Sequence, residues 1–481
     1  MADIIGYSSR SKTDSLEAVG FPLGPSIGGP RQLIPRVNPI AEKARMATLK
    51  ERPHTACRGL RLGCWSATLL LPILSARGQE ALTSAVSLDQ AIAAPANELA
   101  VQPTAGIKLG PAQLGLGFGV SSAYSDNING SEYNPEADWY SQFGTTVDLD
   151  WAATERSDFH LDSGIGYLYY AHYQSNNGLT VTPNSALTYA VSWDDVTLTA
   201  YDQLSYSRQV QTEAALANVS SLPRLDNNAG LRAEYDPGKW TFQASYSYDE
   251  YVTDPSTEYL NRSSQYFFGR IGRFTAPESQ FGMEISEGLT AYEQPIQPNS
   301  DNFSIGLYAE LQLLASLELT VRGGPSADEY LYPAGSGGNL TVTSYYFTVS
   351  LTHQLTDYLS QSIEIDRSTQ PGLVKGTAYI EQLTASYTLS YNLTQFISLS
   401  GTLSVEDGSQ PYTKYISFHG IPIAIPGTEN YTRYGVALSA GWQIAKHWNC
   451  NLSVNRFQRE SNLPGDSYNE DTVSAGINYT F

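Results

Sequence analysis

Residue types that carry cross-links, metal ions or redox chemistry are scarce in this chain. Among its 481 residues are 3 cysteines, 3 methionines and 6 histidines, and only 16% of the residues are charged. Two of the cysteines, Cys57 and Cys64, lie in an amino-terminal segment that we expect to be cleaved off. The remaining thiol, Cys450, can form neither an intramolecular disulfide nor, by itself, a zinc site.

Long apolar runs and positive charge are scarce as well. No apolar run reaches the roughly 18 residues that a membrane-spanning helix requires. The 28 Lys and Arg residues are outnumbered by 48 Asp and Glu residues, which gives a formal net charge of −20. Residues 1–78 hold 11 of the basic residues but only 5 of the acidic ones, so the chain beyond them is still more acidic. Because phosphates bind basic surfaces, we expect no nucleic-acid partner.

The motifs of common enzymes are absent too. The sequence contains no HExxH, GxSxG, phosphate-binding loop or paired-cysteine pattern. Beyond the amino-terminal segment, the histidines scatter over different expected strands, loops and turns, and a pair of His160 with Asp162 is equally explained by ordinary lumen polarity. We therefore expect no catalytic residues, no cofactor and no metal site. Calcium on the acidic residues near 126–138 is the alternative to plain solvated charge.

The amino-terminal segment has the features of a secretory signal peptide, which we place at residues 46–78. Lys50, Arg52 and two further arginines form a positive region, and Cys64–Leu74 form a short apolar region. Small residues at Ala76 and Gly78 suit a cleavage site before Gln79. Residues 1–45 are then a disordered extension or a mis-assigned start, and residues 79–112 a periplasmic lead-in segment.

From Gln113 onward, segments of alternating apolar and polar residues are separated by turn residues. In 303–313, for example, Phe303, Ile305 and Leu307 share one face of an expected strand, while Ser304 and Tyr308 share the other. Eight tight turns alternate with nine longer loops. The tight turns are 154–157, 194–195, 236–239, 276–279, 315–316, 356–357, 393–395 and 445–447. The loops are near 126–138, 173–184, 209–224, 253–261, 293–301, 332–340, 368–377, 407–429 and 460–468.

An even number of strands with short turns on one side and long loops on the other is the pattern of an outer-membrane barrel. The fold class we predict is all-β, a transmembrane antiparallel β-barrel of about eighteen strands over residues 113–481. Strands of this length exceed the usual globular strand. Trp139 and Trp151 bracket one strand and other tryptophans stand beside tight turns, as at a membrane interface.

The chain ends in "SAGINYTF", an alternating strand with an aromatic last residue. Its Ser474, Gly476, Tyr479 and Phe481 match the polar-x-Gly-x-x-aromatic-x-aromatic ending by which outer-membrane barrels are recognised for assembly. We expect this strand to close the barrel. The expected location is therefore the cell outer membrane, with membrane lipid and the assembly machinery as partners.

The sequence resembles the poorly characterised β-barrel porins of Gram-negative bacteria. The resemblance covers about residues 107–481 and includes the step Tyr124-Ser125-Asp126-Asn127-Ile128 after the first strand. It implies a passive channel or an export role, and it defines no catalytic residues.

A barrel of this size is too wide for its side chains to fill, so we expect an aqueous lumen. The polar strand faces supply candidate pore-lining residues, although each charge has the alternative of merely satisfying another across the barrel. Excess carboxylate in the lumen would favour cations. The candidates are Asp148, Asp150, Asp162, Glu310, Glu318, Glu364, Asp366, Arg232, Arg270, Arg322, Tyr140 and Tyr308.

Two loops are candidates for a constriction of this lumen. The segment 416–426, "IPIAIP" included, is apolar and stiffened by proline, so we expect it to fold inward, with packing on the rim as the alternative. The second candidate is 209–224, which we expect to form a short helix.

The function we expect is porin-like passive diffusion of small polar solutes, cations or sugars. One alternative is an export conduit or scaffold of a polysaccharide secretion pathway with periplasmic partners. Another is a structural or adhesive surface barrel. A homo-oligomer remains open at this point.

Overall fold

The computed structural model describes residues 106–210, 213–332, 338–418 and 421–481. All of them belong to one compact unit, which spans Leu71–Phe481. The expected extension (1–45), the signal peptide (46–78) and most of the lead-in segment (79–112) lie outside the described residues, so these assignments stay predictions.

The described chain consists almost entirely of β-strands, joined by turns and loops. The strands up to the middle of the chain are β1 (Ile107–Leu109), β2 (Ala112–Ser125), β3 (Asp138–Thr154), β4 (Ser157–Tyr170), β5 (Gly178–Trp193), β6 (Val196–Ser207), β7 (Arg224–Tyr235), β8 (Trp240–Thr253), β9 (Arg262–Ala276) and β10 (Ser279–Tyr292). The later strands are β11 (Asn299–Leu314), β12 (Leu317–Leu331), β13 (Leu340–Thr356), β14 (Leu359–Pro371), β15 (Tyr379–Thr394), β16 (Ile397–Phe418), β17 (Ile421–Ala445), β18 (Trp448–Ser461) and β19 (Tyr468–Thr480). Two single-turn 3₁₀ segments, η1 (Gln174–Asn176) and η2 (Glu258–Leu260), lie in loops. No helix among these residues is long and apolar enough to cross a membrane.

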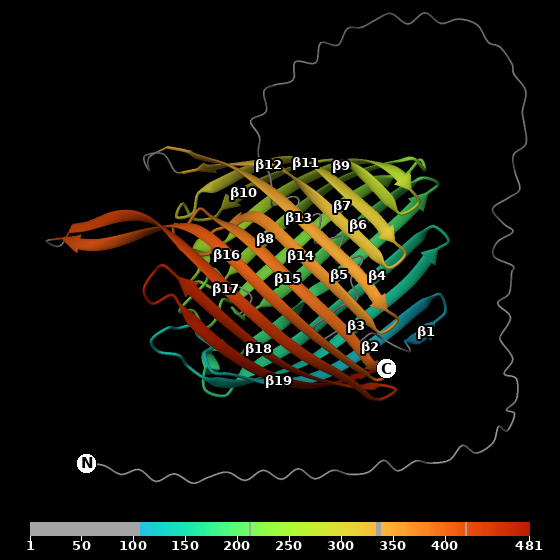
Figure 1. Ribbon diagram of the computed structural model, residues 1–481, viewed down its shortest axis with the longest axis horizontal. Coiled ribbons are helices and arrows are strands. Elements are labelled where there is room, and N and C mark those ends of the chain that lie inside the picture. Colours follow the sequence, from blue (N-terminus) through green and yellow to red (C-terminus); the bar gives the residue numbers. More distant parts are fainter. Residues whose placement is uncertain (1–105, 211–212, 333–337, 419–420) are drawn as a thin grey trace, which may run out of the picture. The chain divides into compact units, whose positions relative to one another are not determined.

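Strands β2 to β19 form a closed antiparallel barrel of eighteen strands, as predicted (Figure 1). Each strand pairs with the next along the chain, and the last pairs with the first, from Thr472↔Ser125 to Thr480↔Gly117. The short β1 forms a hairpin with the start of β2. Closure leaves no long sheet edge in the ring, so its backbone groups are paired without water.

The eight tight turns lie where the sequence predicts them, and they gather at the end of the barrel that holds the carboxyl terminus (Figure 1). The longer loops gather at the other end, called the loop end below. The predicted loop near 173–184 is shorter, because β5 already begins at Gly178.

The prediction of a loop at 407–429 is wrong, and so is the prediction that it folds inward. Strands β16 and β17 continue through it as an antiparallel ribbon to Phe418↔Ile421. The ribbon projects beyond the loop end (Figure 1, orange and red). Prolines such as Pro411 and Pro426 are tolerated there because β16 beyond Ser409 and β17 before Tyr431 have no second neighbour, and a ribbon edge needs no ladder donor.

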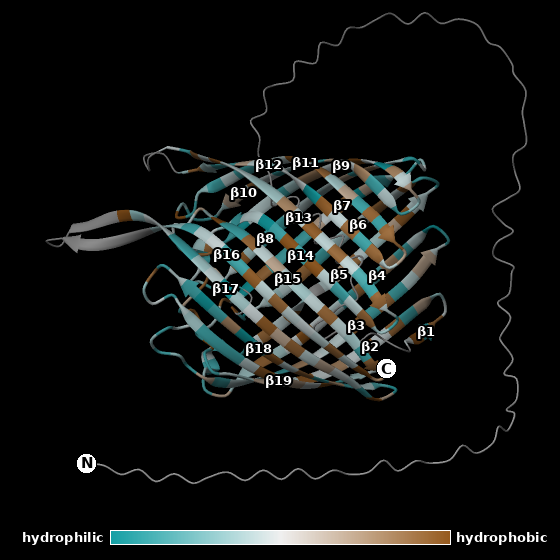
Figure 2. Ribbon diagram, viewed as in Figure 1, coloured by the Kyte–Doolittle hydropathy of each residue, from teal (hydrophilic) through white to brown (hydrophobic). Residues whose placement is uncertain are grey.

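The outer face of the barrel is apolar. On β11, Ile305 and Leu307 are exposed while their neighbours Ser304 and Tyr308 are buried, and Figure 2 shows the same alternation over the other strands. Such a continuous exposed apolar surface marks contact with lipid. Exposed aromatic residues frame it at both ends. At the short-turn end they include Trp151, Trp193, Trp240, Trp442, Trp448 and Phe481, and at the loop end Trp139, Tyr169, Tyr248, Tyr345 and Tyr434.

The spacing of these aromatic girdles matches a membrane. Trp139 and Trp151 are separated along one strand by a rise of roughly 40 Å. At the usual tilt of about 40°, this corresponds to an axial height of roughly 30 Å, the thickness of a bilayer core. The protein is thus a β-barrel of the outer-membrane type, and the outer membrane is its location.

Candidate solute pathway and its loop plug

The polar strand face lines the concave side of the barrel. Side chains on a concave face converge, and contacts there skip over strands. Tyr346 on β13 donates its hydroxyl to Glu284 on β10, 2.8 Å away, although two strands lie between them. Arg322 on β12 also reaches Glu284, at 4.0 Å. Side chains of the polar strand face therefore meet one another on the inside of the ring.

The described residues of the connection between β6 and β7, 208–210 and 213–223, cross the lumen near the loop end; we call them the β6–β7 segment. It contacts strands that lie on the far side of the ring. The backbone carbonyl of Ala214 accepts a hydrogen bond from Nε of Arg459 on β18 at 2.8 Å. The carbonyl of Ala215 accepts one from Nε2 of Gln410 on β16 at 3.4 Å. The second of the two predicted constriction loops is therefore the one that folds inward.

The β6–β7 segment is not the helix that its sequence suggests. Its described residues form isolated turns, such as the bond from the Leu216 amide to the Glu213 carbonyl at 3.1 Å. The carbonyls of Ala214 and Ala215 instead pair with the barrel wall. Contacts with the wall have replaced the helical hydrogen bonds, as tertiary context commonly does.

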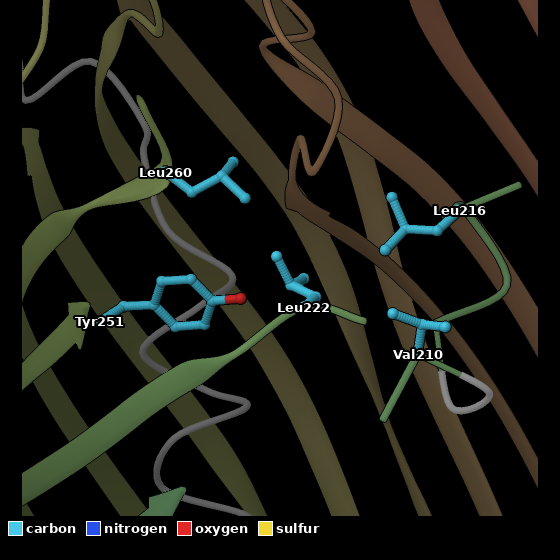
Figure 3. Packing of buried hydrophobic residues seen from close by; sticks show 5 residues of the cluster. All are labelled: Val210, Leu216, Leu222, Tyr251 and Leu260. Carbon is cyan, nitrogen blue, oxygen red and sulfur yellow. The ribbon is translucent and has the colours of Figure 1, made fainter. Parts of the chain in front are cut away.

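The β6–β7 segment has a small hydrophobic core of its own (Figure 3). Val210, Leu216 and Leu222 pack against Tyr251 at the end of β8 and Leu260 in the β8–β9 loop. All five are buried. A second cluster lies against the far wall, where Ala214, Ala215, Ile380 and Tyr431 meet. Apolar burial thus favours the inward position of the segment.

Three further loops join this core: 254–261, 293–298 and 372–378. Together with the β6–β7 segment they form what we call the loop plug. Leu373 packs against both hydrophobic clusters and accepts a bond from the Tyr259 hydroxyl at 3.4 Å. Gln297 donates to the carbonyls of Gly372 at 3.3 Å and Val374 at 3.0 Å. These bonds tie separate loops into one unit inside the barrel mouth.

Below the plug, the middle of the wall formed by β9 to β13 is packed, and the charges of its Arg270 and Arg322 are balanced by glutamates. Arg270 pairs with Glu310 at 3.1 Å, which places two predicted pore residues in one ion pair. The Arg270 guanidinium also lies 5.2 Å from the ring centre of Tyr308. The Tyr308 ring lies against the backbone of Gly282, where even a methyl group would clash. Arg270, Glu310, Arg322 and Tyr308 thus satisfy one another along the wall.

Two other predicted lining residues are also engaged with neighbours. Arg232 forms an ion pair with Glu234 on the same strand. The ring of Tyr140 lies 5.3 Å from that of Tyr170 and packs on a buried cluster with Ile128. Neither side chain is placed as an isolated ligand-binding group.

The remaining six candidates are carboxylates, and they differ from the balanced wall. Within the described residues, none of them forms a salt bridge with Arg or Lys. All lie on the polar strand face between the middle of the barrel and the short turns, and none is buried. They are Asp148, Asp150, Asp162, Glu318, Glu364 and Asp366.

Four polar residues gather on β3 and β4. Asp148 stands directly across from Asp162, and Asp150 directly across from His160. The His160 Nδ1 atom lies 2.7 Å from Asp150, so histidine pairs with Asp150 and not with Asp162. Their side chains are 41% and 63% exposed, as expected beside water. One ligand atom each of Asp148, Asp150 and His160 lies within 4.8 Å of the others, the only such group among the described residues.

Two further charged residues are held by neighbours at the rim and on the outer face of the barrel. Of the acidic residues near 126–138, Asp138 is buried and accepts hydrogen bonds from the His172 and Tyr173 amides, so it serves the rim of the barrel. Arg456 shares the outward face of β18 with Val454 and pairs with Asp471 at 3.1 Å. It lies outside the lumen.

The carboxyl-terminal strand seals the ring as predicted. Tyr479 contacts Trp448 at 4.9 Å and Phe481 at 4.9 Å between ring centres. The Phe481 amide donates to the Leu116 carbonyl at 2.9 Å. Gly476 lies against Asn451, while the Ser474 hydroxyl lies 2.6 Å from that of Ser453. The terminal motif thus joins the first and last strands.

Comparisons with known proteins find similarity only among solved structures. No family model matches the chain, and no curated protein matches it. Among solved structures, OpdK from Pseudomonas aeruginosa is similar with 9% identity, 77% of this chain and 99% of that chain covered, and a TM-score of 0.44. A BenF-like porin from Pseudomonas fluorescens is similar with 9% identity, 78% of this chain and 100% of that chain covered, and a TM-score of 0.44. OccAB3 from Acinetobacter baumannii is similar with 9% identity, 78% of this chain and 100% of that chain covered, and a TM-score of 0.42. At this level of similarity no site residue can be transferred between the chains.

Proposed function

We propose that the protein is a porin-like channel through which small polar solutes diffuse passively, with cations preferred. The observation that supports this most is the charge of the lumen wall. Its arginines pair with glutamates, as in Arg270–Glu310 and Arg322–Glu284, whereas the six carboxylates described above have no such partner. A water-exposed excess of carboxylate attracts cations and repels anions.

Cations are favoured over sugars within this proposal. Sugar binding would draw on exposed aromatic rings, and the tyrosines of the polar strand face include Tyr140, Tyr201, Tyr308 and Tyr346. Tyr201, Tyr308 and Tyr346 are buried against the wall, and Tyr140 packs on Tyr170. The exposed carboxylates are therefore the better candidates for contact with solute. The channel works by size exclusion and electrostatic bias, without turnover.

The test is conductance of the refolded mature protein in a planar bilayer under a KCl gradient. Open steps with a reversal potential on the potassium side would support the proposal. Steps with chloride preference would contradict it.

The loop plug favours one second candidate, an export conduit or scaffold. A barrel whose mouth is filled by four connected loops is suited to stay closed until a periplasmic partner or an exported chain engages it. A correctly folded barrel that stays silent in the bilayer would favour this role over passive diffusion.

We also propose that the terminal motif is the signal read by the outer-membrane assembly machinery. Tyr479 and Phe481 present their rings on the lipid-facing side of the seam strand, where a partner strand or protein can reach them.

A further inference from the structure

We propose that Arg459 is the positioning residue that holds the β6–β7 segment across the lumen, so that its guanidinium sets how open the channel is. The inference rests on the proposed channel function, but one of its tests is independent of conduction.

Arg459 is the largest of the fully buried side chains among the described residues. Its side chain is 0% exposed, and that of its partner Glu429 is 7% exposed. The Nη2 atom donates to Glu429 at 2.7 Å, and Nη1 donates to the Asp466 carbonyl. The guanidinium plane also lies over the Tyr431 ring, 4.5 Å from its centre. A buried charge held this closely in place acts as a rigid anchor.

The third nitrogen of the Arg459 guanidinium, Nε, faces the β6–β7 segment. Nε donates to the Ala214 carbonyl at 2.8 Å, so the guanidinium joins β17, the β18–β19 loop and the segment. Ala214 and Ala215 are buried, and their small side chains let the backbone approach the wall. A buried carbonyl that loses its donor is costly. Without the Arg459 side chain, the inward position of the segment therefore becomes less stable relative to an outward position.

Glu429 keeps the anchor in one orientation. Its Oε1 atom accepts bonds from Arg459 and from the Ser461 hydroxyl at 2.8 Å, and its Oε2 atom accepts one from Gln410 at 2.8 Å. Gln410 in turn donates to the Ala215 carbonyl. One carboxylate thus fixes both side chains that bind successive carbonyls of the segment. Glu429, Arg459 and Gln410 are therefore joined in one hydrogen-bonded group that binds the segment, and we call this group the latch.

Residues on either side of Ala214 and Ala215 are held in other ways, which makes the latch separable. On the amino-terminal side, Glu213 pairs with Arg224 on β7 at 2.9 Å. Further on, the Asn218 side chain donates to the Gly465 carbonyl and to Asp466, each at 3.0 Å. Loss of the latch should therefore free the middle of the segment while the barrel stays closed as a sheet.

The first test compares Arg459→Gln with Arg456→Gln. Arg456 lies on the same strand but faces outward, in an exposed pair with Asp471. In planar bilayers we expect the open fraction of Arg459→Gln to rise roughly tenfold, the factor expected when a charge-assisted bond is lost. Arg456→Gln should match the parent. An equal effect of both variants, or of neither, would overturn the proposal.

The second test reads the position of the segment without conduction. Ala215→Cys is introduced with Cys450→Ser, which removes the native thiol on the outer face. In folded protein, a water-soluble maleimide should label position 215 about tenfold faster when Arg459→Gln is added. An unchanged labelling rate would refute the latch.

The two tests separate the latch from the channel. Faster labelling in a barrel that never conducts would retain the latch and reject the channel. If Arg459→Gln does not fold, the labelling rate is measured in Arg459→Lys instead. Lysine keeps the positive charge beside Glu429 but has no donor at the position of Nε. Arg459→Lys should label faster than the parent, and an unchanged rate would again refute the latch.

Discussion

Asp148 and Asp162 stand directly opposite each other on β3 and β4 and face the lumen as a pair of like charges. Cross-strand like charges destabilise a sheet, and neither residue has an Arg or Lys partner among the described residues. A pair of this kind persists more readily beside water and mobile cations. It is the feature that most clearly distinguishes this wall from the balanced wall of β9 to β13.

Neutralising this pair should weaken cation preference. We expect Asp148→Asn with Asp162→Asn to lower the ratio of cation to anion permeability roughly twofold in dilute KCl. The change should shrink in 1 M KCl, where charges act over only about 3 Å. The reversal potential measures both effects. The control is Asp471→Asn on the outer face, and a shift as large in that variant would mean that the lumen pair does not set selectivity.

The close approach of a tyrosine ring to the wall predicts a stability effect at one glycine. A Cβ on Gly282 would lie 2.0 Å from the Ile271 carbonyl oxygen and 2.7 Å from the Tyr308 ring. Since backbone cannot move away cheaply, Gly282→Ala should lower the free energy of unfolding by about 1–3 kcal/mol. Urea unfolding in lipid vesicles measures it. Gly269→Ala meets only ordinary contact at 3.4 Å and should be near neutral.

The loop plug should respond to pH through Asp466. Burial is the largest cause that raises the pKa of this carboxyl above its usual value of 3.8, with Glu429 adding to it and Arg459 opposing it. A raised pKa means that the docked state binds the proton more tightly than the open state does. Docking is thus strongest in acid and weakens as the pH rises through the raised pKa.

The open fraction in bilayers should accordingly fall as the pH is lowered through the raised pKa of Asp466 towards 3.8. Asp466→Asn keeps an acceptor for Asn218 but removes the titration, so its open fraction should stay low and should lose this step. The charges of Glu429 and Glu132 contribute to the raised pKa of Asp466. An unaltered acid response in Asp466→Asn would mean that Asp466 is not the source of the step.

The barrel could be predicted from local pattern because its determinants are local. Alternation with a period of two selects the lipid face, as Ile305 and Leu307 do on β11. Turn residues such as Asp194 and Asp195 mark where each strand ends. The pattern failed in 407–429, where the residue types are compatible with both a strand and a loop. There proline and apolar residues suggested a loop, although a two-stranded ribbon without neighbours tolerates both.

The loop plug could not be predicted in the same way, because its contacts join distant parts of the chain. Arg459 and Ala214 are 245 positions apart, and no periodicity links them. Glu429 lies at the edge of the predicted loop, so strand alternation could not predict that its side chain faces inward. The one available signal was the position of Arg459 on the inward face of β18, two residues beyond Phe457.

The carboxyl terminus offers a last prediction, which separates recognition from stability. Phe481→Ser keeps the backbone bond to Leu116 and removes only a ring that is 54% exposed. Folding into detergent or lipid in vitro should therefore stay unchanged, while the amount assembled in the outer membrane of cells should fall severalfold. Heat-modifiable migration on gels reports both. Phe396→Ser, at another exposed aromatic of the short-turn end, is the control and should assemble normally. If Phe481→Ser refolds as poorly in vitro as it assembles in cells, the terminal ring is needed for the barrel itself, and the motif is a structural strand end without a separate role in recognition.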